Sequence, residues 1–100
     1  MQPNNRKLLT VVTESVLEQM LCDELIELGA SGYTVVNARG HGNRMTREAG
    51  WSSDSNIRIE VICEANTADR IIKHLKERYY ENYAMILYIA DVAVLRPEKF

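Results

Sequence analysis

Residue types and patterns on which several protein classes depend are scarce in this sequence of 100 residues. It has two cysteines, Cys22 and Cys63, and two histidines, with no CxxC pair and no histidine cluster, so we expect reduced core thiols and no metal site. The longest apolar run, residues 84–90, is far shorter than the roughly 20 residues that span a bilayer, and residues 1–7 lack an apolar signal core. These absences predict a soluble, cytoplasmic chain without direct membrane insertion.

An excess of positive charge is also missing. Lysine and arginine number 12 against 14 aspartates and glutamates, and the resulting net charge of −2 does not supply the basic field of proteins that bind DNA or RNA polymers. The average hides a local cationic segment, because Arg39, Arg44 and Arg47 lie close together beside a glycine-rich turn. We therefore expect no nucleic-acid polymer as a partner, but a local site for a small anion.

What is present is the composition of an ordinary globular domain, with 46% hydrophobic and 26% charged residues. The length allows a single domain over residues 1–100. Residues 1–6 are polar and predict a loose terminus, and the long segment 39–55 loses all periodicity and predicts a loop. Period-two and β-branched patterns predict strands over 7–13, 32–38, 57–63 and 85–95, and helical apolar spacing predicts helices from 15 and from 66 or 67.

Local signals predict where these helices begin and end. Ser15 followed by Glu18 has the pattern of a capping box, and Gly29 supplies a left-handed residue that ends the first helix. Asn66 or Thr67 is the expected N-cap of the second. The helices would then each bury one apolar stripe.

The element order predicts a ferredoxin-like βαββαβ arrangement of the α+β class, an antiparallel sheet with two helices on one face. Alternation places apolar side chains on the opposite face, which has no helix to cover it; they are Val36, Ile62, Ile86 and Tyr88. Such a patch is too apolar to remain in water, so we expect self-association through the sheets. A twist by which these side chains cover one another is the alternative.

The long loop carries the segment Gly40-His41-Gly42-Asn43-Arg44, with Arg47 shortly after it. Glycines let backbone N–H groups face an anion, and guanidinium groups hold phosphate or carboxylate oxygens with paired donors. An anion site and an ordinary solvated hairpin loop are both consistent with this pattern. Trp51 in the same loop either anchors a partner or folds back over the loop. No Ser/His/Asp or Cys/His pairing accompanies His41, so we expect no enzyme.

Three segments together resemble the PII-like signalling proteins. Residues 29–35 are similar to the Gly-x-x-Gly-x-Thr-Val motif of that family, Gly40-x-Gly42 to the glycines that open its T-loop, and residues 57–61 to the strand after that loop. Residues 81–86 depart from the Gly-Asp-Gly-Lys phosphate loop of the classical nitrogen-regulatory members, and the T-loop, residues 39–55, has no tyrosine for uridylylation. The resemblance therefore does not extend to nitrogen sensing with ATP and 2-oxoglutarate.

The inorganic-carbon branch, with the carboxysome-associated PII protein and the regulator of the cyanobacterial bicarbonate transporter, is more similar through Gly-Tyr-Thr-Val, Gly-x-Gly-x-Arg and Asn-Tyr-Ala. This resemblance implies a homotrimer that binds an adenine nucleotide, ADP or AMP, between subunits and responds to bicarbonate. It implies Arg44 and Arg47 as the bicarbonate or anion site, with no catalytic cofactor. The nucleotide-binding residues that it implies are Thr34, Gly40, His41, Gly42, Asn43, Arg44, Ile62, Tyr83, Ala84, Met85 and Arg96.

The expected function is thus a sensor of nucleotide and bicarbonate that regulates inorganic carbon assimilation through its T-loop, with a bicarbonate transporter or a carboxysome component as partner. Three alternatives remain at this point. They are an acylphosphatase-like hydrolase that would use Arg44 and Asn43, a CutA-like trimeric metal-tolerance protein, and a purely structural oligomer.

Overall fold

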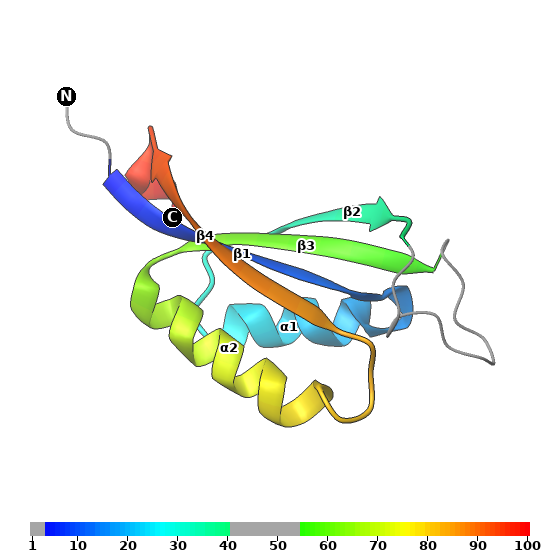
Figure 1. Cartoon of the computed structure of the whole chain (residues 1–100). Coiled ribbons are helices and arrows are strands. Elements are labelled where there is room, and N and C mark those ends of the chain that lie inside the picture. Colours follow the sequence, from blue (N-terminus) through cyan, green and yellow to red (C-terminus); the bar gives the residue numbers. More distant parts are fainter. Residues whose placement is uncertain (1–3, 41–54) are drawn as a thin grey trace.

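The computed structural model describes residues 4–40 and 55–100. These residues form one four-stranded sheet, two α-helices and two short 3-10 turns (Figure 1). In chain order the elements are β1 (Asn4–Glu14), η1 (Ser15–Leu17), α1 (Glu18–Glu27), β2 (Thr34–Ala38), β3 (Asn56–Cys63), α2 (Ala65–Tyr79), β4 (Ile86–Val94) and η2 (Pro97–Lys99).

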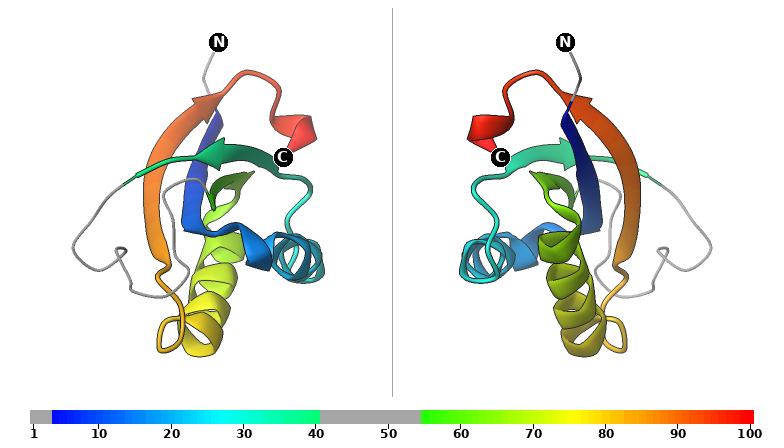
Figure 2. Two further views of the ribbon diagram at one scale, coloured as in Figure 1. Left: turned by 90° about the vertical axis from the view of Figure 1, so that its right-hand side faces the viewer. Right: turned by 90° about the vertical axis from the view of Figure 1, so that its left-hand side faces the viewer.

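The sheet has the strand order β2-β3-β1-β4, and all three pairings are antiparallel. Both helices lie against the same face of the sheet, and the opposite face carries no helix (Figure 2). This arrangement confirms the predicted ferredoxin-like α+β fold. Its two edges are β2 and β4, which lie on opposite sides of the central pair β3 and β1.

The core lies between the sheet and the helices. Alternate residues of β3 from Ile57 to Cys63 are buried, as the period-two pattern predicts, and they face the buried stripes of α1 and α2. Cys22 and Cys63 are free and buried, which confirms the expectation of core thiols. Burial raises the pKa of both thiols, because a thiolate is poorly solvated in an apolar core.

The helix starts differ from the predicted ones. Ser15 begins a 3-10 turn, and the N-cap of α1 is Leu17, with no side-chain cap hydrogen bond, so the capping box is wrong. The reason is tertiary, since the Ser15 N–H donates to the carbonyl of Ser55 at 2.6 Å. Glu64 precedes α2 in place of Asn66 or Thr67. Gly29 has φ of 114° and ends α1 as predicted.

Strand ends also move. β1 begins at Asn4, so the loose terminus predicted for residues 1–6 is wrong from that residue onward. Backbone pairing explains the difference, because Asn4 is opposite Val94 and Arg6 is opposite Val92 on β4. β2 is shorter than the predicted 32–38 and starts at Thr34, whose partner on β3 is Glu60. β4 ends at Val94, one residue before the predicted limit.

The face opposite the helices is apolar over part of its area. Val36, Ile86 and Tyr88 are exposed there and Ile62 is half-buried. Sheet twist therefore does not cover these side chains within one chain, and the patch predicted to drive self-association is present. Among the described residues, no helix is long and apolar enough to cross a membrane.

Candidate functional site

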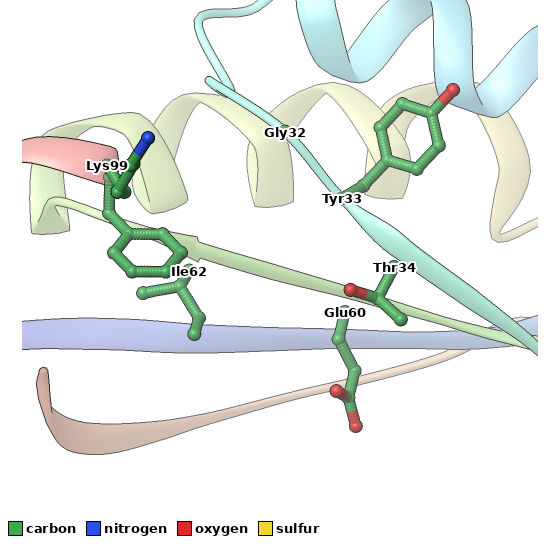
Figure 3. A pocket seen from close by; sticks show the side chains of 7 residues that line it. Gly32, Tyr33, Thr34, Glu60, Ile62 and Lys99 are labelled. Atoms are coloured by element: carbon green, nitrogen blue, oxygen red, sulfur yellow. The ribbon is translucent and has the colours of Figure 1, made fainter. Parts of the chain in front are cut away.

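A hollow of about 190 Å³ lies where β2 and β3 meet the turn η2. It is lined by Gly32, Tyr33, Thr34, Glu60, Ile62, Lys99 and Phe100 (Figure 3). The register explains its floor, because Thr34 is paired with Glu60, and Ile62 follows two residues later on the same face of β3. Thr34 and Ile62, two of the residues implied by the family resemblance, are thereby brought together.

The hollow has a polar part and an apolar part. Glu60 and Thr34 lie beside each other and Ile62 lies further along β3 (Figure 3). The Glu60 carboxylate forms an ion pair with Arg58 on the same strand, with Oε2 at 3.3 Å from Nε. The site thus combines the Thr34 hydroxyl, the Glu60 carboxylate and the aliphatic side chain of Ile62 on one face of the pair β2 and β3.

Tyr33 comes directly before β2, and its side chain lies on the side of α1. Its ring points away from the hollow toward α1 (Figure 3), and its hydroxyl is hydrogen-bonded to the Cys22 thiol. This hydrogen bond raises the pKa of Tyr33.

One wall comes from the segment 97–100. Figure 2 shows η2 curling back toward β2. Phe100 N–H donates to the Pro97 carbonyl at 3.0 Å, and the Ser31 hydroxyl donates to the Lys99 carbonyl at 3.4 Å. Lys99 and Phe100, which follow β4, thereby lie beside β2 and β3.

A second group of the implied residues lies at the connection from α2 to β4. Tyr83 packs against the core and is 5.7 Å from the Tyr79 ring in an edge-to-face arrangement. Ala84 and Met85 are buried, so their side chains are not available on the surface of this chain. The Ala84 N–H donates to Glu14 Oε2 at 3.3 Å, which ties this connection to the end of β1.

The base of the long loop lies at this same end of the sheet. Ala38 is paired with Asn56, and Asn56 with Glu14, so the two ends of the loop adjoin the end of β1. Gly40 therefore lies at the same end of the sheet as residues 83–85. The hollow at Thr34 lies at the other end of β2, on the edge away from β4, so one chain does not bring the two groups together.

The remaining implied residues are placed as follows. Arg96 is exposed, forms an ion pair with Glu98 at 3.6 Å, and is not among the residues that line the hollow. The other residues of the predicted anion segment lie outside the described residues, as does Trp51. They are His41, Gly42, Asn43, Arg44 and Arg47.

Residues 6–99 match the sequence profile of the family described as nitrogen regulatory protein P-II. The chain belongs to this P-II family. Members of the family are signalling proteins and not enzymes, and the acylphosphatase-like alternative is therefore set aside.

Solved structures of PII-like proteins are similar to this family member over nearly its whole length. A PII-like signalling protein of Thermus thermophilus is 44% identical, with a TM-score of 0.84, and the match covers 100% of this chain and 99% of that one. CPII of Thiomonas intermedia, bound to ADP, AMP and acetate, is 25% identical with a TM-score of 0.86, and the match covers 100% and 98% of the two chains.

Another structure of CPII from the same organism, bound to ADP and bicarbonate, is 23% identical with a TM-score of 0.84 and coverage of 99% and 97%. At this identity the similarity supports the fold alone. The ligands are those of CPII, which are ADP, AMP and acetate in the first of these structures and ADP and bicarbonate in the second.

Sequence reasoning missed several residues of the hollow in this P-II family member. Glu60 had a partial signal, because the alternation of β3 places it on the same face as Ile62, but its position opposite Thr34 follows only from the register in the structure. Lys99 and Phe100 had none, since only the tertiary fold brings the segment after β4 to β2. Within residues 4–40 and 55–100, no three His, Cys, Asp or Glu side chains form a group that could hold a metal ion.

Proposed function

We propose that this chain is a PII-like sensor of the inorganic-carbon branch, which binds ADP or AMP together with bicarbonate and regulates carbon assimilation through its T-loop. The observation that carries the proposal is the hollow that joins Thr34, Glu60 and Ile62 at the β2 edge. Membership of the P-II family and the ligands of CPII support it.

The hollow offers the groups that a nucleoside requires. The Thr34 hydroxyl can donate and accept hydrogen bonds, and the Glu60 carboxylate accepts them from hydroxyl or amino groups. Ile62 provides an apolar surface for a base. We assign the base and sugar to this hollow. Arg96 and Lys99 stand at the two ends of η2, the turn whose residues contribute one wall of the hollow. Their positive charges favour the phosphates of a bound nucleotide.

The rest of the site comes from a second copy in this proposal. Gly40 lies at the far end of β2 from the hollow, and residues 83–85 lie across the sheet beside β4, so we place the contact of one nucleotide with both groups between two chains. A homotrimer, joined through the apolar sheet faces, provides three such clefts. Residues 40–44 would then approach the phosphates, and the backbone of Tyr83, Ala84 and Met85 would form the opposite wall of the cleft.

Bicarbonate would act at Arg44 and Arg47 in the T-loop. Ordering a loop costs roughly 1–2 kcal/mol per fixed residue in backbone entropy, so a small anion can order it only when several charge-assisted hydrogen bonds form together. Nucleotide phosphates and bicarbonate together provide these bonds. The ordered loop would then be read in the cytoplasm by a bicarbonate transporter or a carboxysome component.

Calorimetric titration with ADP, with and without bicarbonate, tests this function. We expect ADP to bind, bicarbonate to strengthen its affinity, and Ile62→Ala to weaken it about 10-fold or more, since the base loses its apolar surface. Ile72→Ala is the matched control, because Ile72 is also half-buried but lies on α2. An ADP affinity that bicarbonate leaves unchanged would remove bicarbonate from the proposal, and no binding of ADP or AMP would overturn it.

A further inference from the structure

We propose that Phe100 is the aromatic wall against which the base of the nucleotide stacks, and that it makes the site prefer a purine to a pyrimidine. This inference rests on the proposed function and deepens it, because it names the residue that reads the base. Phe100 is not one of the residues that the sequence implied.

The placement of Phe100 is the first observation. It lines the hollow together with Ile62 and Thr34, although it is far from both in the sequence. Its backbone is held by two hydrogen bonds of the turn η2, Lys99 N–H to the Arg96 carbonyl and Phe100 N–H to the Pro97 carbonyl, each at 3.0 Å. The Ser31 hydroxyl adds a further contact, which it donates to the Lys99 carbonyl.

The exposure of Phe100 is the second observation. The side chain is 40% exposed, although the core of the domain is fully formed without it. A core contact would have buried this residue, whereas Phe100 stays exposed beside a hollow that it lines. An exposed aromatic ring that lines a hollow is the arrangement that stacking on a planar ligand requires.

The chemistry of the other lining residues is the third observation. Ile62 provides an aliphatic surface, and the polar groups Thr34 and Glu60 lie further along the floor. An apolar part that includes an aromatic ring and an aliphatic side chain accepts a flat base, with the polar groups left for the sugar or for the edge of the base. A purine has more stacking area than a pyrimidine, so the ring favours adenine nucleotides over uridine nucleotides.

The test compares ADP and UDP binding to the full chain by calorimetry. Stacking of a base on an aromatic side chain contributes about 5- to 150-fold in affinity, and we expect Phe100→Ala to weaken ADP binding within this range. UDP binding should weaken less, so the ADP-to-UDP affinity ratio falls toward one. Phe100→Trp keeps a stacking surface and should keep the ratio.

Tyr80→Ala is the matched control, because Tyr80 is a 44% exposed aromatic residue at the end of α2, remote from the hollow. It should change neither affinity, and thermal unfolding should show all variants folded. An unchanged ADP affinity in Phe100→Ala, or an equal loss for ADP and UDP, would overturn the stacking role while the sensor function stands. A wild-type chain that binds no nucleotide would overturn both.

Discussion

Glu24 shows how a single polar residue joins the two helices. Its carboxylate on α1 is only 14% exposed and accepts hydrogen bonds from the Tyr79 hydroxyl at 2.9 and 3.0 Å. His74 Nε2 is 2.9 Å from Oε1, and Arg78 Nε is 3.1 Å from Oε2. Burial is the main cause that raises the pKa of Tyr79, which keeps its hydroxyl available as a donor. One carboxylate thus satisfies three side chains of α2.

The first prediction concerns this carboxylate. Glu24→Gln keeps the shape but replaces an acceptor by an NH₂ group that faces donors, so we expect a loss of about 1–3 kcal/mol in the free energy of unfolding. Urea unfolding measures it. Glu27→Gln, an exposed change on the same helix, should leave the free energy of unfolding within about 0.5 kcal/mol of the wild type. Equal effects of the two changes would contradict the role given to Glu24.

At the scale of elements, α1 has one buried and one open face. Leu25 is fully buried, whereas its neighbour Ile26 is 49% exposed. We expect Leu25→Ala to cost about 2–5 kcal/mol, because it leaves a cavity in the core. Ile26→Ala should cost less than about 0.5 kcal/mol. Chemical unfolding of both variants checks this, and a large loss for Ile26→Ala would mean that this face is covered in solution.

The elements were predictable where periodicity alone decides them. The alternation in β3 and the apolar stripe of α2 follow from burial on one side, so the sequence predicts both correctly. The predicted capping box failed because the Ser15 N–H has a partner, the Ser55 carbonyl, that lies far along the chain. The first strand was longer than predicted because β4 pairs with it as far as Asn4.

The candidate site was predictable only in part. Thr34 and Ile62 came from the resemblance to a family, and the structure brings them into one hollow. Glu60 needed the strand register, which the sequence does not specify by itself. Phe100 needed the course of the chain after β4, because no local pattern shows that η2 turns back toward β2.

At the scale of the whole molecule, the proposed homotrimer is joined through the apolar sheet face. Tyr88 is 53% exposed on that face. We expect Tyr88→Lys to shift the chain from trimer to monomer, because a charge is poorly tolerated within an apolar contact between copies. Sedimentation velocity at several concentrations measures the shift. Tyr80→Lys, at the C-cap of α2, should remain a trimer, and a wild-type chain that is monomeric at all concentrations would contradict the assembly itself.

In the proposed assembly, each nucleotide site is divided between two chains. The hollow lies beside β2, whereas the base of the loop lies at the far end of β2 and residues 83–85 lie beside β4. This division has a genetic consequence. Each cleft takes one half from each of two neighbours in a head-to-tail ring. One variant can be inactive because of a substitution in the hollow, and another because of a substitution in the loop base or in residues 83–85. Two such variants can therefore complement each other when they are produced in the same cell. Some mixed rings would contain a cleft in which both contributing halves are intact, although every chain in the ring is defective.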